Sequence, residues 1–227
     1  LFVKPIQGRG GGGAESWRLR MPRRYRNSRG QELSLEQLLE HVALLSKSRG
    51  YLVQPRLINH PLIADLSPGA LSTVRLLTIL DERMEPVPVN AAFRMAVNKA
   101  SPVDNFHAGG IAAAVDIDTG TLARASSLGR DSDFSWHETH PVTGGRILGR
   151  RLPDWEKAKS LVIAAHRLIV PRIVVGWDVG LLADGPCLIE GNCGPDLDIH
   201  QRAELRPIGN ARLGELLAFH MERALKL

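Results

Sequence analysis

The amino-acid sequence predicts an α+β fold for this chain of 227 residues. Segments with helical periodicity follow groups of strand-like segments, and the turns between the strands contain the Asp, Pro and Gly residues that suit antiparallel pairing. Hydrophobic residues make up 44% of the chain and charged residues 23%, which is ordinary for a globular protein that can bury a core. Helices set apart from groups of antiparallel strands indicate α+β rather than a regular α/β alternation.

The chain begins with a predicted strand, LFVKPIQ (residues 1–7), which leads into the glycine loop GRGGGG (residues 8–13). The arginine-rich stretch at residues 18–29 is expected to be a solvated loop, and nucleic-acid binding is the alternative for such a run. Aromatic residues are only 5% of the chain and do not interleave with the arginines at base-stacking spacing. This composition argues against nucleic acid as a partner.

Residues 34–50 predict the first helix. Ser34 is its N-cap, Gln37 completes a capping box, and Gly50 ends the helix. The apolar residues recur at helical spacing, as in an amphipathic helix that packs one face on a core. They are Leu35, Leu38, Leu39, Val42 and Leu45.

The middle of the chain predicts an antiparallel sheet. Residues 51–57 form a short strand that contains a proline, and longer strands follow at residues 72–80, 87–97 and 110–118. Residues 119–151 are polar and rich in glycine, so we expect a long surface or functional loop.

Two helices are expected in the last third of the chain. The first covers residues 154–170, starting at Asp154 after a proline, and the second is amphipathic and covers residues 211–227. Between them, the segment GWDVGLLADGPCLIEGN predicts a hairpin, because Asp-Gly-Pro turn chemistry separates two strand-like runs.

The predicted hairpin brings polar side chains together on one face. Side chains two residues apart share a face of a strand, which places Glu190 beside Asn192. Folding back about the turn brings Asp178 opposite them within about one residue of register. The other face is expected to carry apolar or weakly polar side chains, namely Trp177, Val179, Cys187 and Ile189.

These three oxygen donors are candidate magnesium ligands. Magnesium in proteins is commonly held by one or two carboxylates together with substrate phosphates. An asparagine supplies a further oxygen without adding a second negative charge. The alternative is that Asp178 and Glu190 are surface acids near a turn and that Asn192 only forms a loop.

Lys4 is a candidate phosphate-binding residue because it ends a strand just before the glycine loop. Backbone N–H groups of such a loop can surround a phosphate while a lysine supplies positive charge. The segment is not a P-loop, since no Gly-Lys-Ser/Thr follows, and a flexible turn is the alternative.

Composition also limits where in the cell the protein is expected and which classes of molecule it is expected to bind. The net charge is +5, which suits small anionic substrates as well as nucleic acid. No apolar run reaches about 18 residues and no signal-peptide pattern is present, so we expect a cytoplasmic protein without a membrane partner. Two cysteines do not make a disulfide framework. The chain starts within a strand and without Met, as expected for a piece of a longer protein.

Several motifs, taken in order, resemble those of ATP-grasp proteins, most closely the sugar-transfer-associated branch, which is related to glutamate-ligase-like enzymes. They are VKP…GRGGGG, YLVQPRL, STVRLLT, FRMAVNKASPVDNFHAGG and GWDVGLLADGPCLIEGN. The resemblance implies an ATP-grasp fold, in which two α+β lobes with antiparallel sheets enclose ATP. Residues 1–57 would be a partial glycine-loop lobe that lacks its N-terminal part and ends in a hinge strand. Residues 58–227 would be the magnesium-binding catalytic lobe.

The resemblance also implies roles for individual residues. The phosphates of ATP would be held by Lys4, Gly10, Gly11 and Gly12. The adenine would be read by the backbone around Gln54, Pro55, Arg56 and Leu57. Mg²⁺ or Mn²⁺ would be held by Asp178, Glu190 and Asn192. The γ-phosphate or acyl phosphate would lie near Arg75, Arg94, Asn105 and His107.

Some positions depart from the family's pattern. Related ligases often carry an arginine two residues before the metal-binding Asp, where this chain has Gly176, so Arg75 or Arg94 would have to stabilise the oxyanion. The hinge is commonly acidic, whereas this chain has Gln54, so Asn59 or His60 would have to bind the ribose.

The implied activity is that of an ATP- and Mg²⁺-dependent carboxylate–amine ligase, which forms an amide or peptide bond through an acyl phosphate. Small carboxylates and amines would be its substrates, with their identities and a homo-oligomeric state left open. A non-catalytic ATP/Mg²⁺-binding module is the main alternative, and a basic nucleic-acid-binding protein is a further one.

Overall fold

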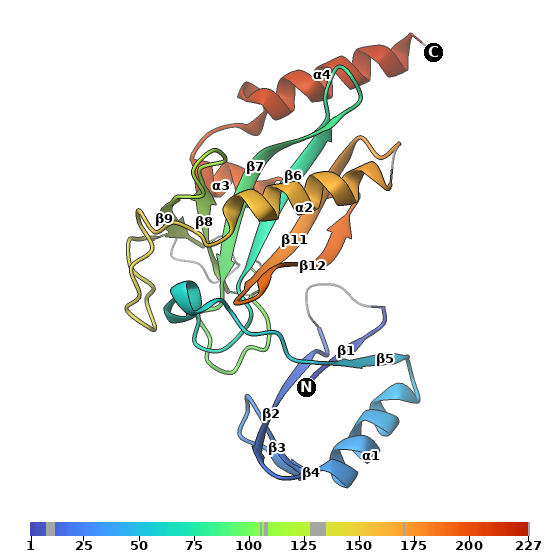
Figure 1. Cartoon of the computed structure of the whole chain (residues 1–227), viewed down its shortest axis with the longest axis vertical. Helices are drawn as coiled ribbons and strands as arrows, with labels where there is room; N and C mark the ends of the chain where they lie inside the picture. Colours follow the sequence, from blue (N-terminus) through green and yellow to red (C-terminus); the bar gives the residue numbers. More distant parts are fainter. Residues whose placement is uncertain (8–11, 105, 107–108, 128–134, 170, 227) are drawn as a thin grey trace.

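The computed structural model contains two antiparallel sheets that lie at opposite ends of the molecule (Figure 1). The structure describes residues 1–7, 12–104, 106, 109–127, 135–169 and 171–226. The first sheet has five strands in the order β4-β3-β2-β1-β5, and the second has seven in the order β10-β9-β8-β7-β6-β11-β12. The predicted α+β class is confirmed.

The five-stranded sheet and one helix form the N-terminal part. Their bounds are β1 Phe2–Pro5, β2 Glu15–Met21, β3 Arg24–Asn27, β4 Glu32–Ser34, α1 Leu35–Ser46 and β5 Tyr51–Gln54. Helix α1 packs on one face of this sheet, where Val3, Trp17 and Leu38 are buried. The capping box at Ser34 and Gln37 is present as predicted.

Two predictions for this part are wrong. The arginine-rich stretch is not a loop, because it forms most of β2 and β3, and burial of Trp17 holds β2 against the helix. Helix α1 ends at Ser46 instead of Gly50. The pairing of β1 with β5 already starts at Gly50, whose carbonyl accepts the N–H of Ile6, so the helix has to end earlier.

The second sheet has helices on both faces. The bounds in chain order are η1 Pro61–Leu66, β6 Thr73–Leu80, β7 Pro86–Met95, β8 Ile111–Val115, β9 Leu122–Ser126, β10 Trp136–His137, α2 Trp155–Arg167, β11 Val174–Leu182, β12 Gly185–Asn192, α3 Asp198–Glu204, η3 Ile208–Asn210 and α4 Arg212–Leu225. The core under α2 includes Phe93, Trp155 and Trp177, while Leu213 and Leu216 of α4 cover the other face.

The expected loop at residues 119–151 contains β9 and β10, which the sequence did not predict. Leu122 and Ala125 of β9 are buried, but Ala123 and Arg124 between them are both exposed, so burial does not alternate along the strand. The pairing of β9 with β8 also contains a register shift between Ala113 and Val115, which a period-two pattern does not anticipate.

The two sheets are linked by residues 55–72. The division into lobes at residues 57 and 58 stays a prediction, and it falls between β5 and η1. One hydrogen bond also joins the two parts directly, from the Ser28 hydroxyl to the Ala100 carbonyl (2.8 Å), and within the linking segment Arg56 Nη2 donates to the Gly69 carbonyl (2.8 Å).

Candidate functional site

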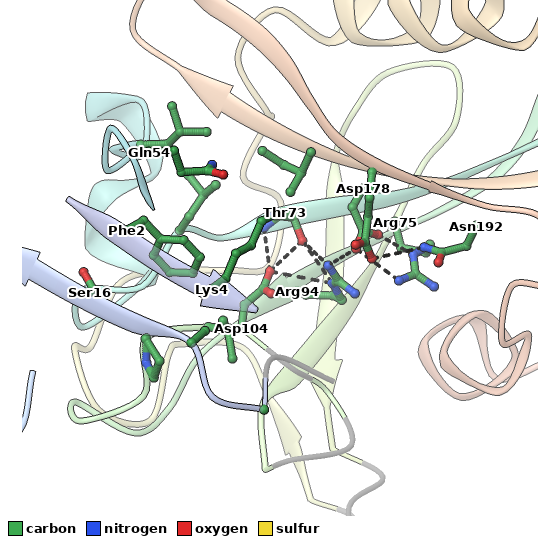
Figure 2. A pocket seen from close by; sticks show the side chains of 18 of the residues that line it. Phe2, Lys4, Ser16, Gln54, Thr73, Arg75, Arg94, Asp104, Asp178 and Asn192 are labelled. Atoms are coloured by element: carbon green, nitrogen blue, oxygen red, sulfur yellow. Dashed lines mark hydrogen bonds and ion pairs between the residues drawn. The ribbon is translucent and has the colours of Figure 1, made fainter. Parts of the chain in front are cut away.

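A cavity of about 790 Å³ lies between the two sheets (Figure 2). Eleven of the residues that the sequence nominated line it: Lys4, Gly12, Gln54, Pro55, Arg56, Leu57, Arg75, Arg94, Asp178, Glu190 and Asn192. The other four nominated residues, Gly10, Gly11, Asn105 and His107, lie outside the described part of the chain. Residues more than 170 positions apart in the sequence thus line one space.

Strand pairing sets the side of the cavity that carries Lys4. Phe2 pairs with both Ser16 of β2 and Gln54 of β5, and directly paired residues share a face. Lys4 lies two residues after Phe2 and so extends the same face toward the cavity. Figure 2 shows Phe2, Lys4 and Ser16 on the side opposite the cluster around Arg94.

The predicted hinge lines the cavity, but the residues suggested for the ribose do not. The Asn59 side chain donates to the Ala70 carbonyl (2.9 Å) and accepts the N–H of Ser72 (2.8 Å). His60 caps η1 by accepting the N–H of Leu62 (3.1 Å). Both side chains bond to the backbone of the connecting segment and neither lines the cavity, so the ribose-binding role of Asn59 or His60 stays a prediction.

The hairpin of β11 and β12 has the predicted register at its polar end. Asp178 pairs directly with Glu190, and Gly176 pairs with Asn192. The Asn192 amide donates to Glu190 Oε1 at 3.3 Å. All three candidate metal ligands therefore belong to one face of the hairpin and line the cavity.

A β-bulge changes the rest of the hairpin. Asp178 pairs with Glu190 whereas Val179 pairs with Leu188, so Ile189 is an extra residue. Leu188 consequently packs against the core with Val179, and Cys187 pairs with Gly180 on the face of Asp178. Ile189 lines the cavity. The prediction that Cys187 and Ile189 lie on the Trp177 face is wrong, because it assumed unbroken alternation.

Asp178 holds two guanidinium groups. Arg75 lies opposite Asp178 on β6, and its Nε is 2.5 Å from Asp178 Oδ1, while Arg94 Nη2 is 2.7 Å from Asp178 Oδ2. Burial raises the pKa of the Asp178 carboxyl, but Arg94 and Arg75 outweigh this effect and leave the pKa below its usual value. Asp178 is therefore ionised and already partly neutralised in this structure.

Arg94 continues the network to Thr73 and Asp104, two cavity residues that the sequence did not nominate. Its Nη2 donates to Thr73 Oγ1 (2.5 Å), and its Nε lies 3.6 Å from Asp104 Oδ2. Burial raises the pKa of the Asp104 carboxyl, although Arg94 opposes this shift. Asp104 stands within the motif FRMAVNKASPVDNFHAGG, but nothing in the local pattern distinguished it from an acid in a turn.

His200 of α3, which does not line the cavity, is a third residue of interest that the sequence did not nominate. It is fully buried, and neither ring nitrogen has a hydrogen-bond partner in the part of the chain that the structure describes. Burial, together with the positive charge of Arg75, lowers the pKa of His200 to about 3. The imidazole is therefore neutral at ordinary pH.

The space beside Gly176 explains why this chain has no arginine there. A Cβ on Gly176 would lie 2.6 Å from Pro195 Cβ and 3.3 Å from Arg75 Cδ. The stem of Arg75 runs past this position, and its guanidinium reaches Asp178 from the neighbouring strand. In this structure β6 carries an arginine that reaches Asp178, and β11 has no room for a side chain at position 176.

The donor set at the hairpin fits Mg²⁺ that arrives with phosphate. Two carboxylates and an amide oxygen are available at Asp178, Glu190 and Asn192, and hard oxygen ligands of this kind suit Mg²⁺ when substrate phosphates complete the shell. Within the described residues no group of three His, Cys, Asp or Glu side chains could hold a metal on its own. The amide and phosphate oxygens would therefore be needed.

Comparison with known proteins gives one match. A family model described as sugar-transfer associated ATP-grasp matches residues 1–210. It is the family that the sequence motifs resemble, so that prediction is confirmed. The searches of curated proteins and of solved structures gave no match. Among the described residues, no helix is long and apolar enough to cross a membrane.

Proposed function

Because the chain belongs to the sugar-transfer-associated ATP-grasp family, we propose that it is a Mg²⁺-dependent carboxylate–amine ligase that converts ATP to ADP. ATP-grasp domains are generally ATP-dependent ligases, and the chain has the ATP-grasp fold. The observation that carries the proposal is that Lys4, the segment 54–57 and the cluster at Asp178 line one cavity. A triphosphate needs cationic and metal-binding groups together in this way.

ATP would lie between the sheets. Lys4 and Gly12 line the cavity on the side of the first sheet, where a lysine and backbone N–H groups suit phosphate. The segment 54–57 would hold the adenine. Mg²⁺ would be held by Asp178, Glu190 and Asn192, and when bound it neutralises charge on the phosphate oxygens.

In the first step, an oxygen of the substrate carboxylate attacks the γ-phosphorus, and the bond to the bridging oxygen of ADP breaks. This step gives an acyl phosphate. Arg75 and Arg94 would donate N–H groups to the phosphoryl oxygens as charge develops, as preorganised donors do in phosphoryl transfer. Both guanidinium groups are largely buried and are held by Asp178, so their positions are fixed before the reaction.

In the second step, the lone pair of a neutral amine attacks the acyl carbon, inorganic phosphate leaves with the electron pair of the C–O bond, and the nitrogen releases one proton to the departing phosphate. Positioning and charge neutralisation supply the catalysis, so no nucleophilic side chain is needed. Arg94 and Thr73 lie beside the carboxylate network and would hold the leaving phosphate.

The experiment that tests the proposal measures ADP release with pooled carboxylates, pooled amines, ATP and a titration of Mg²⁺. Glu190→Ala is expected to abolish Mg²⁺-dependent ADP formation while the fold, followed by circular dichroism, stays intact. Glu40→Ala is the matched control, because Glu40 is an exposed acid on α1 away from the cavity. Unchanged turnover in Glu190→Ala would reject the site.

The same experiment separates the two alternatives. A non-catalytic module would bind ATP with Mg²⁺ and release no ADP with any acid and amine. A nucleic-acid-binding protein would bind oligonucleotides with an affinity that falls steeply with salt and is indifferent to Glu190.

A further inference from the structure

Strand β2 contains arginines that have no role in the chemistry proposed above. Arg18 pairs directly with Arg26 of β3, so two side chains of like charge share one face of the first sheet. It is the face that carries Phe2 and Lys4, because Ser16 pairs with Phe2 and Arg18 lies two residues after Ser16. The face of the sheet that lines the cavity therefore continues into a positively charged surface.

Arg18 and Arg56 both lie against Gly69, which lines the cavity. A Cβ on Gly69 would lie 2.9 Å from Arg18 Nη2, so the Arg18 guanidinium is in contact with this glycine. Arg56 also lines the cavity, and its Nη2 donates to the Gly69 carbonyl (2.8 Å). Burial lowers the pKa of Arg56, and the positive charge of Arg18 lowers it further. Two cationic groups therefore lie close together at the rim of the cavity.

In the part of the chain that the structure describes, neither of these two guanidinium groups forms an ion pair with a carboxylate. Arg26, by contrast, lies 3.8 Å from Glu32. Arg56 uses one N–H group on a backbone carbonyl, and a guanidinium has several more. Water can solvate the remaining N–H groups, but it does not neutralise the two charges. An anion between the two groups would accept their N–H groups and remove their mutual repulsion.

We propose that Arg18 and Arg56 bind a second anionic group of the acid substrate, a carboxylate or a phosphate. This inference rests on the ligase function proposed above. The carboxylate that is phosphorylated would lie at Arg75 and Arg94, and the second anionic group would lie at the rim of the cavity. The substrate class is therefore an acid with two anionic groups, in place of a simple monocarboxylate.

The wall between the two ends of this substrate is a short piece of chain. Gly69, Leu71 and Thr73 all line the cavity, and Arg94 donates to the Thr73 hydroxyl. From Gly69 to Thr73 the chain spans at most about 14 Å, so one elongated small molecule can reach from the rim to Arg94. The Arg56 side chain is directed to Gly69, which leaves the backbone of residues 54–57 available for adenine.

Binding of linear dicarboxylates tests the inference without requiring turnover. The probes run from succinate to sebacate, and each is compared with the monocarboxylate of the same chain length. They are titrated by NMR in the presence of Mg²⁺ and a non-hydrolysable ATP analogue. We expect at least one dicarboxylate to bind the wild type about fivefold more tightly than its monocarboxylate, and Arg18→Gln to reduce this preference about two- to fivefold, as for the loss of one exposed ion pair.

Arg20→Gln is the matched control, because it removes the same charge from an exposed position of β2 where the register with β3 shifts. The inference is overturned if the wild type prefers no dicarboxylate. It is also overturned if Arg18→Gln and Arg20→Gln reduce the preference equally, since the effect would then come from net charge. If Arg18→Gln does not fold, Arg18→Thr supplies the same comparison with a residue that suits a strand.

Two further measurements distinguish other anions that the arginines could bind. A loss of affinity for the ATP analogue in Arg18→Gln as large as the loss for the dicarboxylate would assign the arginines to the nucleotide. Salt-sensitive binding of oligothymidine that Arg18→Gln abolishes would assign them to nucleic acid. Either result overturns the inference.

The binding measurement also separates failure of this inference from failure of the ligase proposal. A preference for dicarboxylates that depends on Arg18 supports the anion-binding role even if no acid yields ADP. A preference that does not depend on Arg18 overturns this role even if ligase turnover is found.

Discussion

Asp178 takes part in both elements of the candidate site, the metal-ligand set and the arginine network. Its carboxylate is a candidate metal ligand, yet it already accepts hydrogen bonds from Arg75 and Arg94. Guanidinium groups donate strong hydrogen bonds to phosphate oxygens as well as to carboxylates. We therefore expect Arg75 and Arg94 to keep their positions and to share their N–H groups between Asp178 and a bound triphosphate, while the remaining lone pairs of Asp178 face the cation that accompanies it.

Gly176→Ala tests how tightly this arrangement is packed. The added methyl group would lie 2.6 Å from Pro195 Cβ and press on the stem of Arg75, neither of which can move without disturbing the strand or the ion pair. We expect a loss of about 1–3 kcal/mol in the free energy of unfolding, measured with urea, as for other overpacked sites.

Gly194→Ala is the control for this stability measurement. It lies two residues after Asn192, and a Cβ there would meet no atom within 4 Å. A Gly176→Ala protein as stable as the wild type would contradict the account given for the missing arginine.

The sequence nominated most of the charged residues that line the cavity, but neither Asp104, which lines it, nor His200, which is buried in α3 and does not. The nominated residues stand in motifs whose order and spacing are distinctive. Asp104 and His200 gain their character from burial in the folded chain, since an aspartate in a turn and a histidine in a polar segment have no special neighbours in the sequence. Burial of that kind depends on which elements pack together, and local pattern does not contain it.

At the scale of single elements, the capping box of α1 gives a direct prediction. The Ser34 hydroxyl accepts the N–H of Gln37, and the Gln37 side chain accepts the N–H of Ser34. Ser34→Ala should cost about 0.5–2 kcal/mol in the free energy of unfolding, because one of the free N–H groups of the first helical turn loses its acceptor.

Ser48→Ala, an exposed serine just beyond the helix, should change the unfolding free energy by less than about 0.5 kcal/mol. Chemical denaturation of both variants decides the matter. Equal stability of Ser34→Ala and the wild type would show that the cap does not limit the stability of the protein.

Element boundaries were predicted best where local chemistry defines them. The cap of α1, the two-residue turn of the β11–β12 hairpin and the strands β6 and β7 have such signals. The bulge at Ile189 and the strands β2, β3 and β9 do not. The pairing of β2 with β3, of β9 with β8 and of β12 with β11 contains a register shift in each case, and period-two reasoning does not anticipate such an irregularity.

At the scale of the whole molecule, His200 links stability to pH. The unfolded chain binds a proton on this histidine below pH 6.5, whereas burial keeps the folded-state pKa at about 3. Because the unfolded state then binds more protons, the contribution of His200 to stability is complete above pH 6.5 and is lost as the pH falls. The loss should approach about 1.4 kcal/mol for each pH unit.

His200→Leu removes this titration while it keeps a buried side chain of similar size. Urea unfolding at several pH values between 7 and 4.5 should give a slope lower by about one proton than the wild-type slope. His137→Gln, at a half-buried histidine on β10, serves as the control. An identical slope in His200→Leu and the wild type would mean that the imidazole becomes protonated within the fold.

The relation of the two sheets could be anticipated only through the family resemblance. Composition and periodicity predicted strands and helices, but no local signal places β1 across a cavity from β11, because Lys4 and Asp178 are separated by most of the chain. The cavity is a property of two packed bodies, and its lining residues came from motifs whose meaning depends on that arrangement.

The extra residue in β12 affects how sequences of this family should be aligned. In a relative with the same turn and a regular hairpin, the residue paired with the equivalent of Asp178 would come one residue earlier after the turn than Glu190 does in this chain. Alignments should therefore accept a one-residue gap at Ile189 and not at the turn. A gap at this position aligns Gly185 at the turn, and also Glu190 and Asn192, with their equivalents in the relative.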